Sequence, residues 1–119
     1  IVIGSDTPQL SAEVLRAAFE RLDTCDAVIG PSDDGGYYLL GLRRPCAALF
    51  DGVAWSTDSV LRQTLERGAR NGLVFELLET SFDIDEAQDF ERLRALLRVH
   101  GAALCPQTAE LLRDAERSA

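Results

Sequence analysis

The first eight residues constrain the fold of this chain more than any other stretch. Ile1 to Ile3 form an apolar, β-branched run, and a turn of small residues that contains one acid, Asp6, follows directly. Such a run predicts a strand, and ligands of open α/β sheets bind at the carboxyl ends of the strands. Asp6 therefore stands where a metal-binding or catalytic carboxylate is expected. Asp6 could equally cap a turn, with Pro8 leading into the helix that follows, so both interpretations stay open.

Strand and helix patterns alternate along the rest of the chain. The expected strands cover residues 1–3, 27–30, 37–42 and 73–78, and the expected helices cover residues 11–22, 57–70, 86–100 and those from 106 onward. The first strand reads as fully buried. Strand–helix–strand units of this kind are typical of parallel sheets. We therefore expect an α/β fold: a three-layer αβα sandwich with a mostly parallel sheet. No repeat or linker divides residues 1–119, which indicates a single domain.

Charge and composition exclude several classes of partner. The chain has 119 residues and a formal net charge of −8, so a nucleic-acid backbone would be repelled. No apolar run approaches the roughly 20 residues that a membrane-spanning helix needs. The three cysteines lie far apart and form no Cys-x-x-Cys pair, a usage that favours reduced thiols and a cytoplasmic location.

An acid-x-acid triplet, Asp83-Ile84-Asp85, stands in a loop between the last expected strand and the helix after it. In extended backbone its two carboxylates point the same way. If the first and last strands share one parallel sheet, Asp83 and Asp85 could converge with Asp6 on Mg²⁺ or Mn²⁺, because these ions prefer oxygen ligands. The alternative is that Asp85 caps the helix, with Gln88 completing a capping box, and that Asp83 is a solvated loop acid.

The loop of residues 33–36 is the strongest turn signal in the chain. Gly35 and Gly36 would let the backbone approach a ligand closely, while Asp33 and Asp34 offer an acceptor or base for a hydroxyl group. A tight polar turn between two strands accounts for the same residues equally well.

Trp55, Ser56 and Thr57 form a third candidate. An aromatic ring beside a helix N-terminus can stack on a planar or sugar ring, and the free N–H groups of the helix can meet an anion. The alternative is a buried tryptophan followed by an ordinary helix N-cap at Ser56 or Thr57.

Taken in order, these motifs resemble a known family. Residues 3–8, the Asp-Asp-Gly-Gly-Tyr-Tyr segment within residues 30–42, residues 55–57 and residues 83–85 recur in a bacterial group of GT-A-fold, glycosyltransferase-like proteins. Some members are linked to arsenosugar biosynthesis, and the group is related to the nucleotide-diphospho-sugar transferases, which include guanylyltransferases. The likeness covers nearly the whole chain.

The resemblance implies an activity and a set of sites. It implies metal-dependent transfer of a sugar from a nucleoside-diphosphate sugar to a small acceptor, or nucleotidyl transfer with release of pyrophosphate. Asp6 would bind the metal and diphosphate together with Asp83 or Asp85, and Asp34 would serve as acceptor base. The expected site residues are Asp33 and Asp34 as catalytic groups, Gly35, Gly36, Tyr37, Trp55, Ser56 and Thr57 as substrate-binding groups, and Asp6, Asp83 and Asp85 as metal ligands.

The resemblance also implies that residues 1–119 are the C-terminal two-thirds of a larger GT-A-like domain. The N-terminal part, with the loop that holds the nucleotide, would then be missing. A half-sheet of this kind would leave a strand edge open for pairing between copies, so a homodimer is expected. A catalytically inert, self-associating fragment is the remaining alternative.

Overall fold

The computed structural model describes residues 1–119 and contains one sheet of four strands. The strands are β1 (Val2–Ile3), β2 (Ala27–Pro31), β3 (Tyr37–Leu42) and β4 (Phe75–Leu77), and their order across the sheet is β1-β3-β2-β4. The strand positions expected from the sequence are thus correct to within a few residues.

The sheet is mixed, so the expectation of a mostly parallel sheet is wrong for adjacent strands. β3 pairs antiparallel with both β1 and β2, and only β2 and β4 form a parallel pair. The cause is the short loop of residues 33–36, because a loop of this length can join only antiparallel neighbours. β1, β2 and β4 still run in one direction, and the hairpin inserts β3 between the first two.

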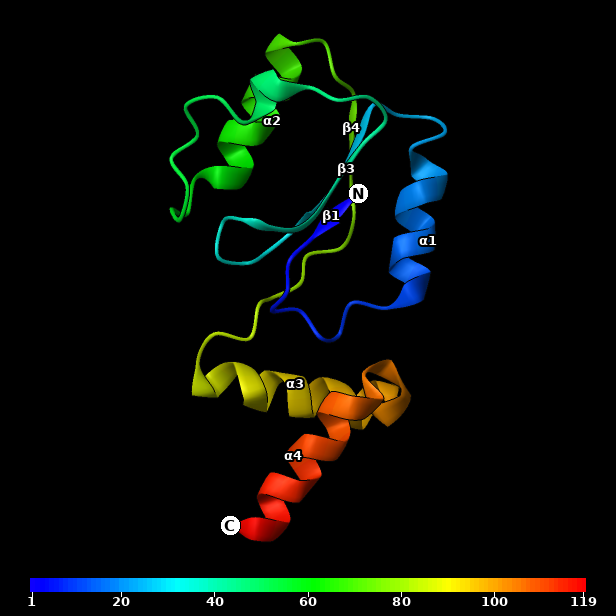
Figure 1. The fold of residues 1–119 in the computed structure, drawn as a ribbon, viewed down its shortest axis with the longest axis vertical. Helices are drawn as coiled ribbons and strands as arrows, with labels where there is room; N and C mark the ends of the chain where they lie inside the picture. Colours follow the sequence, from blue (N-terminus) through cyan, green and yellow to red (C-terminus); the bar gives the residue numbers. More distant parts are fainter.

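Helices α1 (Ala12–Arg21) and α2 (Val60–Arg70) lie on opposite sides of the sheet (Figure 1). On the α1 side, Ala18 packs with Val28, Leu39 and Tyr38 in a buried cluster. Ser11 caps α1 as expected, since its hydroxyl accepts a hydrogen bond of 3.3 Å from the backbone N–H of Val14.

The packing of α2 depends on a glycine. A Cβ atom at Gly68 would lie 1.9 Å from Cε2 of Phe75, so only a residue without a side chain lets the helix approach β4 this closely. Thr64, one turn earlier, is fully buried and donates its hydroxyl to the carbonyl of Val60 at 2.9 Å. Glycine and threonine therefore make the contact surface that larger apolar residues usually provide.

Helices α3 (Ala87–His100) and α4 (Pro106–Ser118) extend away from the sheet (Figure 1). The molecule measures 52 × 29 × 18 Å. Two short 3₁₀ turns complete the structure, η1 at Ala47–Leu49 and η2 at Ala102–Leu104. The expected three-layer sandwich is not established, because these two helices lie beyond the end of the sheet. None of the helices combines the length and apolar character needed to cross a membrane.

β1 corrects a further expectation. The first strand was predicted to be fully buried, yet Val2 is 73% exposed and Ile3 is 48% exposed. β1 pairs only with β3 and forms an edge of the sheet.

Candidate functional site

Three loops meet at the carboxyl ends of β1, β2 and β4. The N–H of Ile84 donates to the carbonyl of Asp6 at 2.8 Å, and the N–H of Asp33 donates to the carbonyl of Ser81 at 3.0 Å. The hydroxyl of Thr7 donates to Oδ1 of Asp83 at 2.8 Å. These bonds bring segments from the start, middle and end of the sheet together at one edge.

A cluster of three carboxylates lies at this edge. Asp34, Asp83 and Asp85 each offer a carboxylate oxygen, and these oxygens lie within 4.8 Å of one another. The sequence predicted convergence of Asp83 and Asp85 with Asp6. In the structure Asp34 completes the closest trio, whereas Asp6 borders it through the backbone bond to Ile84. We refer to Asp34, Asp83 and Asp85 as the acidic cluster.

The electrostatics of the acidic cluster reflect its crowding. Burial raises the pKa of Asp83 above its usual value; the hydrogen bond from Thr7 opposes this, and the charges of Asp34, Asp85 and Asp6 add to it. The pKa of Asp85 is also raised, by desolvation and by the charges of neighbouring acids, Asp6 foremost. The ionised form of each of these two carboxylates is therefore unfavourable, and a bound cation would stabilise it.

Asp85 does not cap α3, contrary to one interpretation of the sequence. The N-cap is Glu86, and Asp89 completes the capping box by accepting the backbone N–H of Glu86 at 2.9 Å. Asp89 also accepts the N–H of Asp85 at 3.1 Å, and these two backbone bonds lower the pKa of Asp89. The capping positions lie one residue later than the predicted Asp85 and Gln88, and the Asp85 carboxylate stays free for the acidic cluster.

A cleft of about 410 Å³ opens beside the acidic cluster and shares Asp34 with it. The cleft is lined by Asp34, Gly36, Tyr37, Trp55, Ser56, Thr57, Asp58 and Val60. All but one of the substrate-binding residues predicted from the sequence therefore line one cavity, the exception being Gly35. Asp58 and Val60 were not predicted.

On one side of the cleft, Trp55 is exposed to solvent, and contacts with Phe50 and Arg67 hold its loop in place. Trp55 is 51% exposed and stacks on Phe50 with ring centroids 6.4 Å apart, so the interpretation as a buried core tryptophan is wrong. Ser56 adopts a positive φ of 60°, a strained conformation that is frequent at functional sites. Arg67 holds the start of this loop through the carbonyls of Asp51 and Gly52, at 2.7 and 2.8 Å.

Neither Ser56 nor Thr57 caps α2. The helix begins at Val60 and its N-cap position is Ser59, which makes no capping hydrogen bond through its side chain. The Thr57 hydroxyl instead donates to the carbonyl of Ala54 at 2.6 Å and closes a turn. The two residues therefore shape the cleft rather than the helix end.

The loop of residues 33–36 is docked on the N-terminus of α2. Gly35 has a φ of +90°, and a Cβ atom there would lie 1.9 Å from the carbonyl oxygen of Asp58. Its own carbonyl accepts the N–H of Leu61 at 2.8 Å. Oδ1 of Asp34 accepts the N–H of Gly36 at 2.9 Å, which orients this side chain within the acidic cluster. Glycine is therefore required at position 35 by its contact with Asp58, which the sequence could not show.

Asp33 lies apart from the acidic cluster. Its Oδ2 forms an ion pair with Nη2 of Arg92 at 2.7 Å, so this carboxylate is already partnered in the structure. Arg92 and Thr7 were not predicted as site residues from the sequence, although Thr7 lies inside the motif that contains Asp6. A threonine that directly follows a candidate ligand is the only signal that could have pointed to it.

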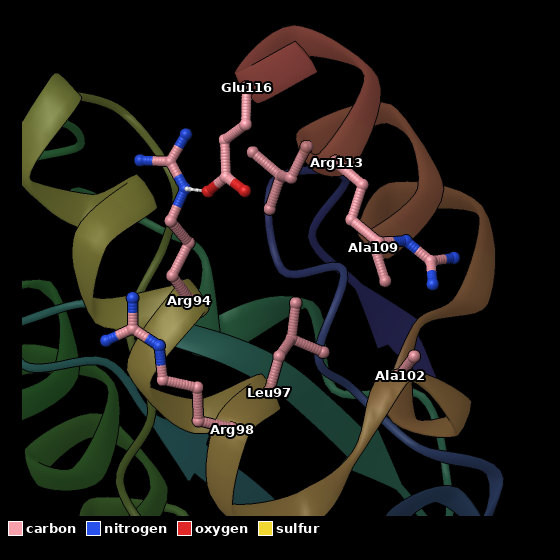
Figure 2. Close-up of a pocket in the computed structure, with 8 residues that line it drawn as sticks. Arg94, Leu97, Arg98, Ala102, Ala109, Arg113 and Glu116 are labelled. Atoms are coloured by element: carbon pink, nitrogen blue, oxygen red, sulfur yellow. Dashed lines mark ion pairs between the residues drawn. The ribbon is translucent and has the colours of Figure 1, made fainter.

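A second, smaller cleft of about 220 Å³ separates α3 from α4 (Figure 2). Arg94 and Arg98 project into it from α3, and Nε of Arg94 pairs with Glu116 of α4 at 3.1 Å. None of its lining residues belongs to the acidic cluster or to the Trp55 cleft.

Comparisons with known proteins bear on this geometry. The chain superposes on the crystal structure of a proposed nucleotide-diphospho-sugar transferase from Desulfovibrio desulfuricans G20, determined at 1.90 Å, with a TM-score of 0.79 and 32% sequence identity. The fold matches that of a nucleotide-diphospho-sugar transferase. The match covers 94% of this chain and 52% of the transferase, so the chain spans about half the length of its relative.

Residues 1–57 also match a family described as uncharacterized proteins conserved in bacteria, DUF2064. This segment contains Asp6, the 33–36 loop and Trp55. No curated protein matches the sequence. The predicted likeness to a nucleotide-diphospho-sugar transferase fold and to an uncharacterized bacterial family is confirmed. The link to arsenosugar biosynthesis stays a prediction.

Proposed function

We propose that the protein transfers a sugar from a nucleoside-diphosphate sugar to a small acceptor, with Mg²⁺ or Mn²⁺ bound by the acidic cluster. The observation that carries this proposal is the approach of three carboxylate oxygens, from Asp34, Asp83 and Asp85, to within 4.8 Å of one another beside the Trp55 cleft. The relative with a transferase fold supports the reaction class.

The donor set suits a hard divalent cation. Only carboxylate oxygens converge at the acidic cluster, and such ligands favour Mg²⁺ or Mn²⁺ over softer metals. Three carboxylates fill only part of the octahedral coordination of Mg²⁺, which leaves positions for water or phosphate oxygens. When bound, the cation would neutralise negative charge that develops on the diphosphate leaving group.

The cleft provides the groups that would bind and orient the substrates. The exposed ring of Trp55 offers a face on which a sugar can stack, and Tyr37 lines the same cavity. Asp34 belongs to both the cleft and the acidic cluster, so it is placed either to bind the cation or to accept the proton of an acceptor hydroxyl.

Calorimetric titration of the full-length protein with Mn²⁺, with and without a nucleoside diphosphate, tests the proposal. We expect Mn²⁺ binding that strengthens nucleotide binding, and loss of both in Asp83→Asn and Asp85→Asn. Asp23→Asn, at an exposed position beyond the end of α1, is the matched control with the same change of charge and should bind as the parent does.

Product analysis separates the two reactions that this fold could support. Release of a nucleoside diphosphate identifies sugar transfer, and release of pyrophosphate identifies nucleotidyl transfer instead. Asp34→Asn separates the two roles of that residue, because a ligand role weakens Mn²⁺ binding whereas a base role lowers turnover at unchanged Mn²⁺ affinity. Absence of metal-linked nucleotide binding would overturn the proposal.

A further inference from the structure

Arg92 of α3 contacts both loops that carry the acidic cluster. Its Nη2 lies 2.7 Å from Oδ2 of Asp33, and its guanidinium carbon lies 3.9 Å from the centroid of the Phe82 ring. Asp33 directly precedes Asp34, and Phe82 directly precedes Asp83. One guanidinium group therefore joins the β2–β3 loop to the segment between β4 and α3.

The third contact runs through Asp89. Nη1 of Arg92 lies 3.9 Å from Oδ1 of Asp89, and the other oxygen of Asp89 accepts the backbone N–H of Asp85 at 3.1 Å. The side chain of Asp89 is only 13% exposed. Arg92 thus reaches the backbone of Asp85 through a single, well-packed carboxylate.

A planar guanidinium is suited to this arrangement. It can pair with one carboxylate at its edge while its face covers an aromatic ring, a combination that the ammonium group of lysine does not reproduce. A half-exposed ion pair by itself adds little to folding stability. The arrangement has a different consequence: it fixes the spacing between loops whose like charges would otherwise push them apart.

We propose that Arg92 is a positioning residue that holds Asp34, Asp83 and Asp85 at the separation a divalent cation requires. The inference rests on the metal site of the proposed function. Arg92 does not contact the cation in this proposal and acts only through Asp33, Phe82 and Asp89.

Charge and geometry predict opposite effects on metal affinity. Removal of a positive charge near the acidic cluster would, by electrostatics alone, tighten the binding of a cation. Loss of a residue that orients metal ligands typically weakens binding by roughly 10–100-fold. The direction of the change in Arg92→Gln therefore distinguishes a positioning residue from one that only contributes charge.

The test is a titration with Mn²⁺ alone, followed by the electron paramagnetic resonance signal of the free ion. We expect a Mn²⁺ Kd that is at least about tenfold higher in Arg92→Gln. Arg92→Lys retains the charge but loses the fork and the ring contact, and it should also bind more weakly. The control is Arg98→Gln, the same change on the same helix; Arg98 lies in the α3–α4 cleft (Figure 2), and its variant should bind as tightly as the parent or slightly more tightly.

Unchanged or tighter Mn²⁺ binding in Arg92→Lys and Arg92→Gln would overturn the inference. Circular dichroism confirms that each variant is folded, and Arg92→Lys provides the answer if Arg92→Gln is not. Hydrogen exchange without metal separates this inference from the proposed function. Faster exchange at the N–H groups of Gly36 and Asp85 in the Arg92 variants, but not in Arg98→Gln, is expected even if the parent binds no Mn²⁺.

Discussion

The hydroxyl of Thr7 donates a hydrogen bond of 2.8 Å to Oδ1 of Asp83, across 76 positions of the chain. Thr7 is 6% exposed, so the bond lies largely out of water. It ties the loop after β1 to the loop before α3 and opposes the burial that raises the pKa of Asp83. Thr7 and Asp83 therefore join these two loops through their side chains, beside the backbone bond from Ile84 to Asp6.

Thr7→Val should destabilise the fold by about 1–3 kcal/mol, because it leaves a partly buried carboxylate without its donor while it conserves the side-chain shape. Urea denaturation measures the change. Thr57→Val is the control, since that hydroxyl is exposed and its partners, Ala54 and Ser59, lie within two or three residues of it; the variant should stay within about 0.5 kcal/mol of the parent. Equal losses in the two variants would contradict the assigned role of Thr7.

Asp83→Asn should make the free energy of unfolding less dependent on pH. The pKa of Asp83 is raised in the folded state, so the native protein binds this proton more tightly than the unfolded chain does. Its contribution to stability is present at low pH and is lost as the pH rises through the raised pKa. At pH 7 the variant should therefore melt at a higher temperature than the parent, and the difference should vanish below the unfolded pKa of about 4.

Thermal unfolding from pH 3 to pH 8 checks this expectation. Asp23→Asn removes one exposed acid far from the acidic cluster and controls for the general change in net charge. A difference in melting temperature at pH 7 that persists unchanged at pH 3 would show that the ionisation of Asp83 does not cause it.

Gly35→Ala should destabilise the protein by more than the cost of its backbone conformation. Gly35 and Gly72 both have positive φ values, of 90° and 73°, but only a Cβ atom at Gly35 meets backbone, 1.9 Å from the carbonyl oxygen of Asp58. Gly72→Ala should cost about 1–2 kcal/mol, the price of the left-handed conformation alone. Gly35→Ala should cost more and should also weaken Mn²⁺ binding, because the loop that carries Asp34 must move. Denaturation and Mn²⁺ titration of both variants measure this, and equal costs would contradict the close approach.

Trp55→Ala should weaken binding of the sugar substrate with little effect on folding. The ring is half exposed and contacts Phe50, so its removal leaves no cavity in the core. Loss of one stacking contact of about 0.5–1.5 kcal/mol corresponds to an increase of up to roughly tenfold in Kd. Leu111→Ala, at a 69% exposed position on α4, is the control for removal of exposed apolar surface. Unchanged affinity in Trp55→Ala would exclude the ring from the binding site.

Local features of the fold could be predicted from the sequence because their causes are local. Ser11 caps α1, Pro106 begins α4, and Gly101 follows α3 with a positive φ, each for reasons contained within a few residues. The cap of α3 shifted by one residue because Glu86 and Asp89 satisfy the same spacing as Asp85 and Gln88.

The candidate site was predictable in its parts but not in its grouping. Asp83 and Asp85 lie two positions apart in the chain, so their shared direction follows from the backbone alone. The replacement of Asp6 by Asp34 in the closest trio depends on where the 33–36 loop docks. That docking is fixed by the approach of Gly35 to Asp58, a contact between segments that no local pattern records.

The sequence by itself determined the succession of strands and helices, the turn that follows β2 and the acids at the strand ends, since these depend on periodicity and turn chemistry. Only the tertiary structure decided that β3 lies between β1 and β2, that Asp34 joins Asp83 and Asp85, and that Arg92 contacts the segments that carry them. The physical reason is that these relationships arise from pairing and packing between distant segments. The direction of a hairpin strand, the space around a glycine and the contacts of a guanidinium group are set only when distant loops pack against one another.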